Sequence, residues 1–281
     1  MPNHIVLDPE DEMSSITSGN AKQYGDSQRL AARARLNRDY TISETGWFEW
    51  VASRLPLRAN AAVLDTGCGP GWFWAATVTK LPENLDLTLS DVSPGMVKEA
   101  VERCQPLFAS VHGRQADAAA LPFDDGSFDA VIAMHMMYHL PDPAKRIAEM
   151  YRVLKPGGFL AVTTNGVGNM RKLYELTTVF GSPPFDPAAA AFGYHEAELL
   201  MRSQFGNVTM SQHPARLHVT EPEDVFLALT SYPPGDEASE TKLAEFRDAI
   251  TEAFRRGGGA LDTDKETGLF LSVKSASDSP P

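Results

Sequence analysis

The chain has 281 residues, of which 43% are hydrophobic, and a formal net charge of −12 at pH 7. This length suits one large domain, or one domain with an elaborated cap, and the hydrophobic fraction is enough for a sizeable core. The acidic balance argues against nucleic acid as a partner, because neutralising phosphates needs a basic surface.

Targeting segments and cysteine content indicate the compartment of the protein. No apolar run reaches the ~18–20 residues of a membrane span, and the first residues lack the basic and apolar regions of a secretory signal. The two cysteines, Cys68 and Cys104, give no disulfide framework. We therefore expect a cytoplasmic protein with a small-molecule partner, no nucleic acid and no membrane. Whether the protein forms a homo-oligomer is left open.

The first half of the chain predicts two helices and then a regular alternation. Apolar periodicity predicts helices over 28–40 and 43–55, with Ser43 as the N-cap of the second. Strands are predicted at 61–66, 86–90, 111–115, 128–134 and 159–164, with helices at 72–81, from Pro94 and after Pro143. Repeated strand–helix units of this length are typical of a parallel, doubly wound α/β sheet.

The pattern changes after Asn165. A helix with a proline-rich loop is predicted at 166–187, and further elements are helices at 196–205, 221–232 and 241–256, an extended segment at 208–219 and a strand at 268–273. These late helices exceed what the sheet needs for cover. We expect some of them to form a cap over the functional site.

The most informative stretch is VLDTGCGPGWF, residues 63–73. An apolar strand runs into Asp65 and then into a turn with glycine at every second position, and glycine permits positive φ and a close approach of the backbone to a ligand. The next strand ends in Asp91, at the sheet edge where open α/β sheets bind nucleosides. The sequence therefore predicts a nucleoside site at this edge.

The residues of the turn discriminate between nucleosides. A dinucleotide site needs G-x-G-x-x-G, but Trp72 occupies the third glycine position and Pro70 removes a backbone amide. Asp65 would repel a diphosphate, whereas it suits a ligand with an ammonium group. These features favour S-adenosylmethionine, and a dinucleotide-dependent dehydrogenase is the weaker alternative.

At this point the chain resembles the class I S-adenosylmethionine-dependent methyltransferases, in their small-molecule, methyltransferase-11-like branch. The segments VLDTGCGPGWF, SDVSPGM, ADAAALPFDDGSFDAVIAMHMMYHLPDP and LKPGG stand in the family's order. The resemblance implies a doubly wound, Rossmann-like α/β fold with a mostly parallel seven-stranded sheet, N-terminal helices and a helical cap insertion. It divides the chain into an N-terminal helical cap segment (1–57), a cofactor-binding core (58–167) and substrate cap helices with the last strands (168–281).

The resemblance also implies which residues bind S-adenosylmethionine and its product S-adenosylhomocysteine. The methionine part would lie against Asp65, Gly67, Cys68, Gly69 and His135, with Tyr24 and Arg33 closing on its carboxylate. The ribose hydroxyls would bind Asp91, and the adenine would lie among Val92, Met96, Asp117 and Ala118.

Three residues are candidates for catalysis: His135, His139 and Tyr138 between them. If this stretch is helical, the two imidazoles share a face. A histidine near the methyl group is a natural general base, with His139 favoured over His135. A structural or pocket-lining role is the alternative. No metal is expected, because no third ligand is obvious.

The activity expected is methyl transfer to O, N or C of a small, aromatic or apolar molecule of the kind found in secondary metabolism. Aromatic residues of the late segments favour such an acceptor, with core packing as the alternative for each: Phe180, Phe185, Phe192, Tyr194, His195, Phe226 and Tyr232. A second class of function stays open. A protein with this fold can bind the same cofactor and act as a cyclase or a regulatory binder.

Overall fold

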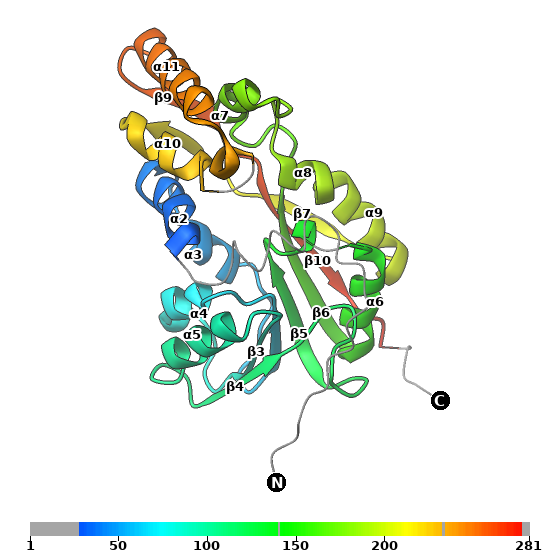
Figure 1. Ribbon diagram of the computed structural model, residues 1–281. Coiled ribbons are helices and arrows are strands. Elements are labelled where there is room, and N and C mark those ends of the chain that lie inside the picture. Colours follow the sequence, from blue (N-terminus) through cyan, green and yellow to red (C-terminus); the bar gives the residue numbers. More distant parts are fainter. Residues whose placement is uncertain (1–27, 140, 232–233, 277–281) are drawn as a thin grey trace.

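The computed structural model describes residues 28–139, 141–231 and 234–276 (Figure 1). Tyr24 and Tyr232 lie outside the described residues. Arg33 lies in helix α2 (Gln28–Tyr40), and the description does not extend to its side chain. Within the described parts, no helix combines the length and the apolar character needed to cross a membrane.

A seven-stranded sheet forms the centre of the molecule, in the order β4-β3-β2-β5-β6-β10-β7. Its strands are β2 (Ala62–Thr66), β3 (Asp86–Asp91), β4 (Ser110–Gln115), β5 (Phe128–Met134), β6 (Leu154–Asn165), β7 (Thr209–Gln212) and β10 (Thr267–Val273). The first five pair in parallel, and β10 runs antiparallel to both β6 and β7. The predicted mostly parallel, seven-stranded α/β sheet is confirmed.

Helices cover both faces of this sheet (Figure 1). One face carries α3 (Trp47–Ala52), α4 (Trp72–Thr77) and α5 (Pro94–Cys104), and the other carries α6 (Pro143–Val153), α8 (Pro187–Phe192) and α9 (Tyr194–Phe205). The strand order reverses between β2 and β5, so a crevice is expected at the carboxyl ends of these strands. This switch point fixes where a ligand can meet the sheet.

The start of α5 is as predicted, but the start of α3 is not. Ser93 Oγ accepts a hydrogen bond from the amide of Met96 at 3.4 Å, and a proline occupies the first turn. In contrast, α3 begins only at Trp47, and the Ser43 hydroxyl donates to the carbonyl of Thr45. The preceding residues pair as strand β1 (Thr41–Ile42), and this tertiary pairing overrides the local helical pattern.

A second sheet, which the sequence did not predict, organises the cap. It has the antiparallel order β1-β8-β9, with β8 (Arg216–Val219) and β9 (Leu261–Asp264). The single extended segment predicted at 208–219 is therefore divided, because β7 joins the large sheet and β8 the small one. β9 was missed because its four residues, LDTD, are too few for a distinct periodic signal.

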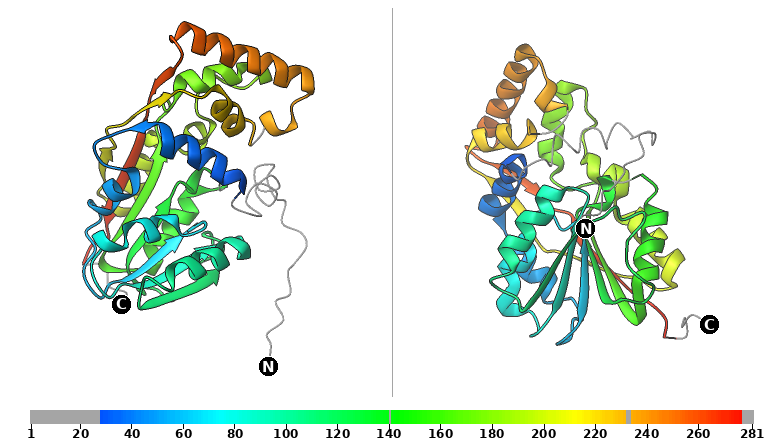
Figure 2. Two further views of the ribbon diagram at one scale, coloured as in Figure 1. Left: turned by 90° about the vertical axis from the view of Figure 1, so that its left-hand side faces the viewer. Right: turned by 60° about the horizontal axis from the view of Figure 1, so that its bottom comes forward.

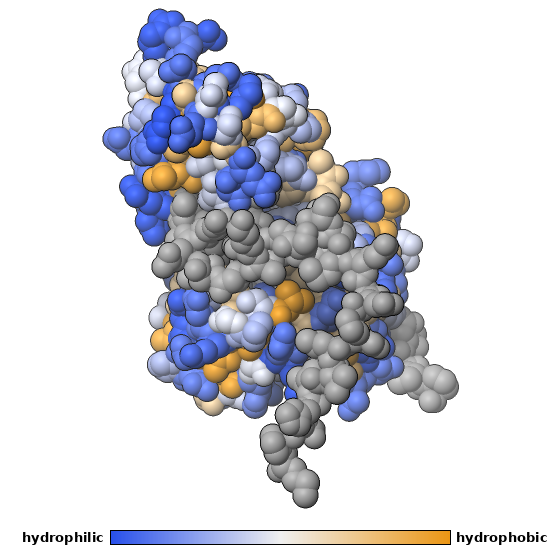
Figure 3. All heavy atoms as spheres, in the orientation of Figure 1, coloured by the Kyte–Doolittle hydropathy of each residue, from blue (hydrophilic) through white to orange (hydrophobic). Residues whose placement is uncertain are grey.

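The cap helices pack on this small sheet and lie beyond the carboxyl ends of β5 and β6 (Figures 1 and 2). They are α2, α7 (Arg171–Leu176), α10 (Pro222–Leu229) and α11 (Glu240–Arg256), with a core that includes Leu36, Leu173, Val225, Phe246 and Ile250. Their outer surface on the visible face is mostly hydrophilic (Figure 3). The cap thus stands at the same end of the sheet as Gly67, as the cap hypothesis requires.

Candidate functional site

The glycine turn that follows β2 depends on three left-handed residues, Gly67, Gly69 and Gly71, with φ of 68°, 53° and 74°. A Cβ on Gly67 would lie 2.8 Å from the side chain of Met136, and one on Gly71 would lie 3.0 Å from the Cα of Ala100. A Cβ on Gly69 would meet nothing within 4 Å. Two of the glycines therefore permit close packing, and Gly69 leaves open space at the turn.

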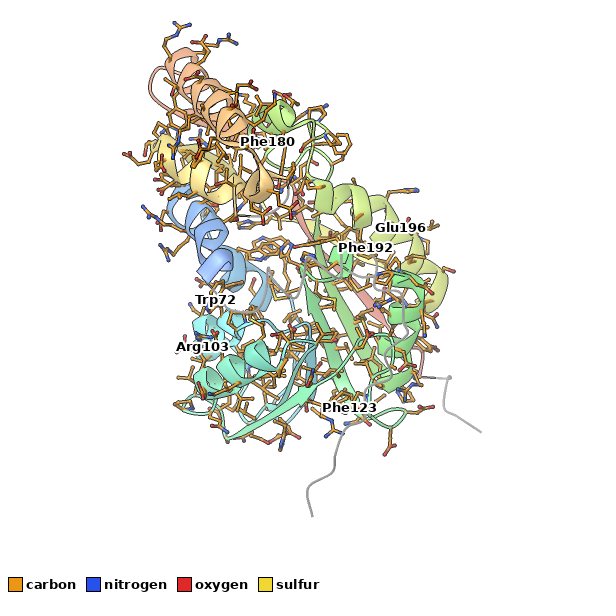
Figure 4. All side chains as sticks on the ribbon, viewed as in Figure 1. Trp72, Arg103, Phe123, Phe180, Phe192 and Glu196 are labelled. Atoms are coloured by element: carbon orange, nitrogen blue, oxygen red, sulfur yellow. The ribbon has the colours of Figure 1, made fainter. Side chains whose placement is uncertain are left out.

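Two further contacts hold the turn. The amide of Cys68 donates to the carbonyl of Ser90 at 2.9 Å, and Arg103 donates to the carbonyl of Pro70. Figure 4 shows Arg103 and Trp72 together on this side of the sheet, on α5 and α4. Burial, followed by the nearby carboxylates of Asp65 and Asp91, raises the pKa of the Cys68 thiol, so this cysteine is a packing residue rather than a nucleophile.

Asp91 connects the turn to the next helix. Its Oδ2 accepts from the Gly69 amide at 3.1 Å and its Oδ1 accepts from the Ser93 amide at 2.9 Å. Burial raises the pKa of Asp91, although these amide hydrogen bonds oppose the shift. A carboxylate oxygen accepts more than one hydrogen bond, so both oxygens can still accept a pair of vicinal hydroxyls, as a ribose would present.

Asp65 is the most unusual group in the turn. Its side chain is buried, with the residue only 3% exposed, and its Oδ2 accepts from Trp74 Nε1 at 2.7 Å, whereas its Oδ1 has no hydrogen-bond partner. Burial raises the pKa of Asp65 to about 7, despite the Trp74 hydrogen bond, and the charge of Asp91 adds to the rise. A buried carboxylate with an unpartnered oxygen is costly, and an ammonium group would satisfy it.

The residues expected around an adenine lie on both sides of Asp91. Val92 is 56% exposed and Met96 is buried beneath it in α5. Asp117 follows β4, and its Oδ1 accepts from the amide of Ala119 at 2.8 Å, while Ala118 is buried. Because β3 and β4 are neighbours in the sheet, these residues stand at one edge with Asp91.

The three candidate catalytic residues come together after β5, but not on one helix. Residues Met137–His139 form a short 3₁₀ helix, and His135 precedes it with a left-handed φ of 51°. The two imidazoles were expected to share a face only if this stretch is helical, and it is not, because the backbone at His135 turns out of the helical region. Tyr138 lies between them, with ring centroids 6.4 Å from His135 and 4.5 Å from His139.

The environment of His135 sets its protonation. Its amide donates to the carbonyl of Thr163 at 3.2 Å, which fixes the residue to β6. Burial, and then the positive charges of Lys265 and His139, lower the pKa of His135 to about 4. The imidazole is therefore neutral at neutral pH and a weak proton acceptor.

Three residues that the sequence did not assign to the site lie in the region of His135, and Trp47 is the one in ring contact with it. Trp47 lies 5.5 Å, between ring centroids, from both His135 and His213, and His213 Nε2 is 2.8 Å from the carbonyl of Thr45. Lys265 lies close enough for its charge to lower the pKa of His135 and, behind burial, of His213. Trp47 falls within the helix predicted over 43–55, and His213 and Lys265 stand in connections without a motif.

Most of the late aromatic residues do not line a site. Phe192 is fully buried against the sheet (Figure 4), and Tyr194 packs on Phe270. Phe180 and Phe226 both pack on Phe246 in the cap core. These contacts are those expected of core packing, the alternative given above, although Phe180 also lines a surface pocket with Pro234, Glu237, Ala238 and Lys242. Among the described residues, no group of three or more His, Cys, Asp or Glu side chains is arranged to hold a metal ion.

Comparison with known proteins identifies a methyltransferase domain over residues 64–162. A ubiquinone/menaquinone biosynthesis C-methyltransferase of Proteus mirabilis is 28% identical over 189 residues, which are 66% of this chain and 64% of that enzyme. A ubiquinone biosynthesis O-methyltransferase of Xanthomonas oryzae pv. oryzae is 39% identical over 122 residues, 41% of this chain and 47% of that enzyme. The chain thus spans less than two thirds of the length of either relative.

Among solved structures, the [4+2]-cyclase SpnF is similar with a TM-score of 0.58 at 19% identity, over 94% of this chain and 97% of the cyclase. At this identity the likeness concerns the fold alone. The reaction has to be argued from the residues of the site.

The carboxylate of Asp65 makes the stability of the protein depend on pH. A carboxyl group whose pKa rises on folding from 3.8 to about 7 stabilises the folded state at low pH, and this contribution is lost as the pH rises towards 7. We expect Asp65→Asn to gain stability relative to the wild type as the pH rises from about 4 to 7, and to keep this advantage at higher pH. Urea denaturation across this range measures the difference.

Asp124→Asn, at an exposed turn, is the matched control and should follow the wild type at every pH. If the stability of Asp65→Asn and that of the wild type depend on pH in the same way, the Asp65 carboxyl group does not have a raised pKa.

Proposed function

We propose, from the premise that residues 64–162 form a class I S-adenosylmethionine-dependent methyltransferase domain, that the chain transfers a methyl group to O, N or C of a small acceptor. The acceptor would be an aromatic or apolar molecule of the natural-product type. The product of the donor would be S-adenosylhomocysteine.

One observation carries the proposal: the unpartnered Oδ1 of buried Asp65 beside the satisfied but accessible carboxylate of Asp91. An ammonium group would provide the missing partner of Asp65, and ribose hydroxyls would donate hydrogen bonds to the carboxylate of Asp91. Gly67 and Gly69 would present main chain to the same ligand, with Cys68 between them. S-adenosylmethionine combines an ammonium group with a ribose and supplies the methyl group as a sulfonium, so the residues present fit it.

The remaining work of the protein is to orient the acceptor, exclude water and remove a proton. The ring of His135 lies 5.5 Å from that of Trp47 and 6.4 Å from that of Tyr138, between centroids, and these rings would offer a surface for a flat acceptor. An attacking hydroxyl, amine or carbon must lose its proton. His139 is the proposed general base, because the lowered pKa of His135 leaves that imidazole too weakly basic.

Two other functions remain testable alternatives. A protein with this fold can bind the cofactor and catalyse a cyclisation, or regulate without transfer, and the similarity to a cyclase keeps this class open. A dinucleotide-dependent dehydrogenase is the other alternative. It is disfavoured because Asp65 would face a pyrophosphate at the turn.

The proposal is tested by binding first and transfer second. Isothermal titration calorimetry should show S-adenosylhomocysteine binding and no NAD binding, and mass spectrometry of an acceptor panel with S-adenosylmethionine should then show the gain of one methyl group. Tight binding of NAD and none of S-adenosylhomocysteine would refute the proposal. Cofactor binding without methylation of any acceptor, cell extract included, would favour the non-transferring alternative.

Replacing Asp91 should weaken the cofactor site specifically. We expect Asp91→Ala to lose about 1.5–3 kcal/mol of S-adenosylhomocysteine binding, because charge-assisted hydrogen bonds to the ribose are removed. Asp86→Ala, at the exposed start of the same strand, is the control and should bind normally. Unchanged affinity in Asp91→Ala, measured by calorimetry on folded protein, would remove Asp91 from the ribose site.

The choice of base is a separate prediction. With an acceptor found in the panel, His139→Ala should lower kcat by roughly 10²–10⁴-fold with little change in KM, because loss of a general base affects proton removal rather than binding. His135→Ala and Tyr138→Phe should lower kcat less, and His112→Ala, on exposed β4, should not change it. Full kcat in His139→Ala would assign His139 to the lining of the pocket.

A further inference from the structure

Arg146 is a buried arginine near the start of α6, with a side chain that is only 6% exposed. Its Nη1 donates to the carbonyl of Pro141 and, at 3.2 Å, to that of Asp142, the two residues that lead into the helix. Its Nε is buried and has no hydrogen-bond partner among the described residues. The backbone before α6 therefore holds the guanidinium group without satisfying all of its donors.

The position of Arg146 is unfavourable for a cation. It is the fourth residue of α6, close to the N-terminal end, where the helix dipole favours negative charge. On the same helix Arg152 is balanced by Asp125 at 2.7 Å and Glu149 at 2.9 Å, and its side chain stays 30% exposed. Burying a charge is costly unless it is paired, so the carboxylate next to Arg146 is important for keeping it there.

That carboxylate belongs to Asp117. Nη2 of Arg146 lies 3.5 Å from Oδ1 of Asp117, and this is the ion pair that Arg146 makes among the described residues. The same Oδ1 accepts from the amide of Ala119 at 2.8 Å. Both contacts use one oxygen of a side chain that is 54% exposed, and no described residue donates to Oδ2. Oδ2 is therefore available to accept a hydrogen bond from a ligand.

Backbone hydrogen bonds place Asp117 beside the proposed ribose site. The amide of Ala116 donates to the carbonyl of Asp91 at 3.1 Å, and Nε2 of Gln115 donates to the carbonyl of Val92 at 3.0 Å. The segment that carries Asp117 is thus tied to the end of β3. A ribose bound at Asp91 would bring its base towards Asp117.

We propose that Arg146 is a positioning residue of the donor site, which holds the Asp117 carboxylate by Oδ1 so that Oδ2 accepts a hydrogen bond from the 6-amino group of adenine. The inference rests on the proposed function and adds the residue that sets the preference for the base. The carbonyls of Pro141 and Asp142 fix the guanidinium group, and the guanidinium group fixes the carboxylate. A purine without the amino group lacks the donor, so discrimination between the two bases depends on where Oδ2 lies.

The test compares two ligands that differ only in this amino group, S-adenosylhomocysteine and its analogue with unsubstituted purine in place of adenine. Calorimetry on the complete protein measures the dissociation constant of each. We expect the wild type to bind S-adenosylhomocysteine roughly 10-fold more tightly than the analogue, as one hydrogen bond to a charged acceptor would give. Asp117→Ala should bind both ligands with the affinity that the wild type has for the analogue.

Two variants of Arg146 separate positioning from folding. Arg146→Gln keeps a donor for the two carbonyls but lacks the charge that holds Asp117, so the preference for adenine should fall below about 3-fold while the analogue binds as in the wild type. Arg146→Lys keeps the charge on a single nitrogen and should retain an intermediate preference. Lys145→Gln, the same change at the adjacent exposed position of α6, is the matched control and should behave as wild type.

A double-variant cycle shows whether the effect passes through Asp117. In the Asp117→Ala background, adding Arg146→Gln should change neither dissociation constant, because the carboxylate that Arg146 holds is already absent. A role in folding alone would weaken the binding of both ligands by the same factor, and it would do so in either background.

The inference is overturned if the wild type binds the two ligands equally, if Asp117→Ala keeps the preference, or if folded Arg146→Gln keeps it in full or weakens both ligands by the same factor. If Arg146→Gln does not fold, Arg146→Lys decides, and an unchanged preference in that variant contradicts the inference. Loss of folding in both variants would assign Arg146 to the stability of the fold and would also overturn it. Failure of S-adenosylhomocysteine to bind the wild type would instead refute the proposed function.

Discussion

The placement of one buried and one partly buried carboxylate at the carboxyl ends of two neighbouring parallel strands is the constraint on which the site depends. Asp65 and Asp91 end the neighbouring strands β2 and β3, and burial raises the pKa of both. Amide and indole hydrogen bonds hold three of their four oxygens, and the remaining Oδ1 of Asp65 has no partner. The turn therefore suits a ligand that brings positive charge, because a cation lowers the cost of keeping these carboxylates ionised.

The cap depends on the sheet through a few polar contacts rather than through one continuous core. α2 is tied to α10 by Tyr40, which donates to Asp224 at 2.6 Å, and by Arg35, 3.1 Å from the same carboxylate. Lys265 joins α2 and β1 to the connection that enters β10. Since β10 pairs with β6, these contacts connect α2 to the strand whose Thr163 accepts from the amide of His135.

Local chemistry explains what the sequence could predict. The strand–acid–glycine pattern, the Ser93 cap and the period of the strands are local signals, and each is found where the sequence predicted it. The small sheet of the cap, the short α3 and the 3₁₀ turn at His139 depend on pairing between distant segments or on a single backbone angle. No local pattern encodes such features, so the sequence analysis missed them. Trp47, His213 and Lys265 come from three distant segments of the chain. For the same reason, no recognisable sequence motif contains them.

This separation has a consequence for specificity. The groups proposed to bind the donor lie in the turns that follow neighbouring strands at one end of the sheet. Backbone geometry fixes their positions, and the sequence motifs of these turns make them recognisable. The groups that border the acceptor side come from α3, the β7–β8 connection and the β9–β10 connection, and they can change one at a time without altering the fold.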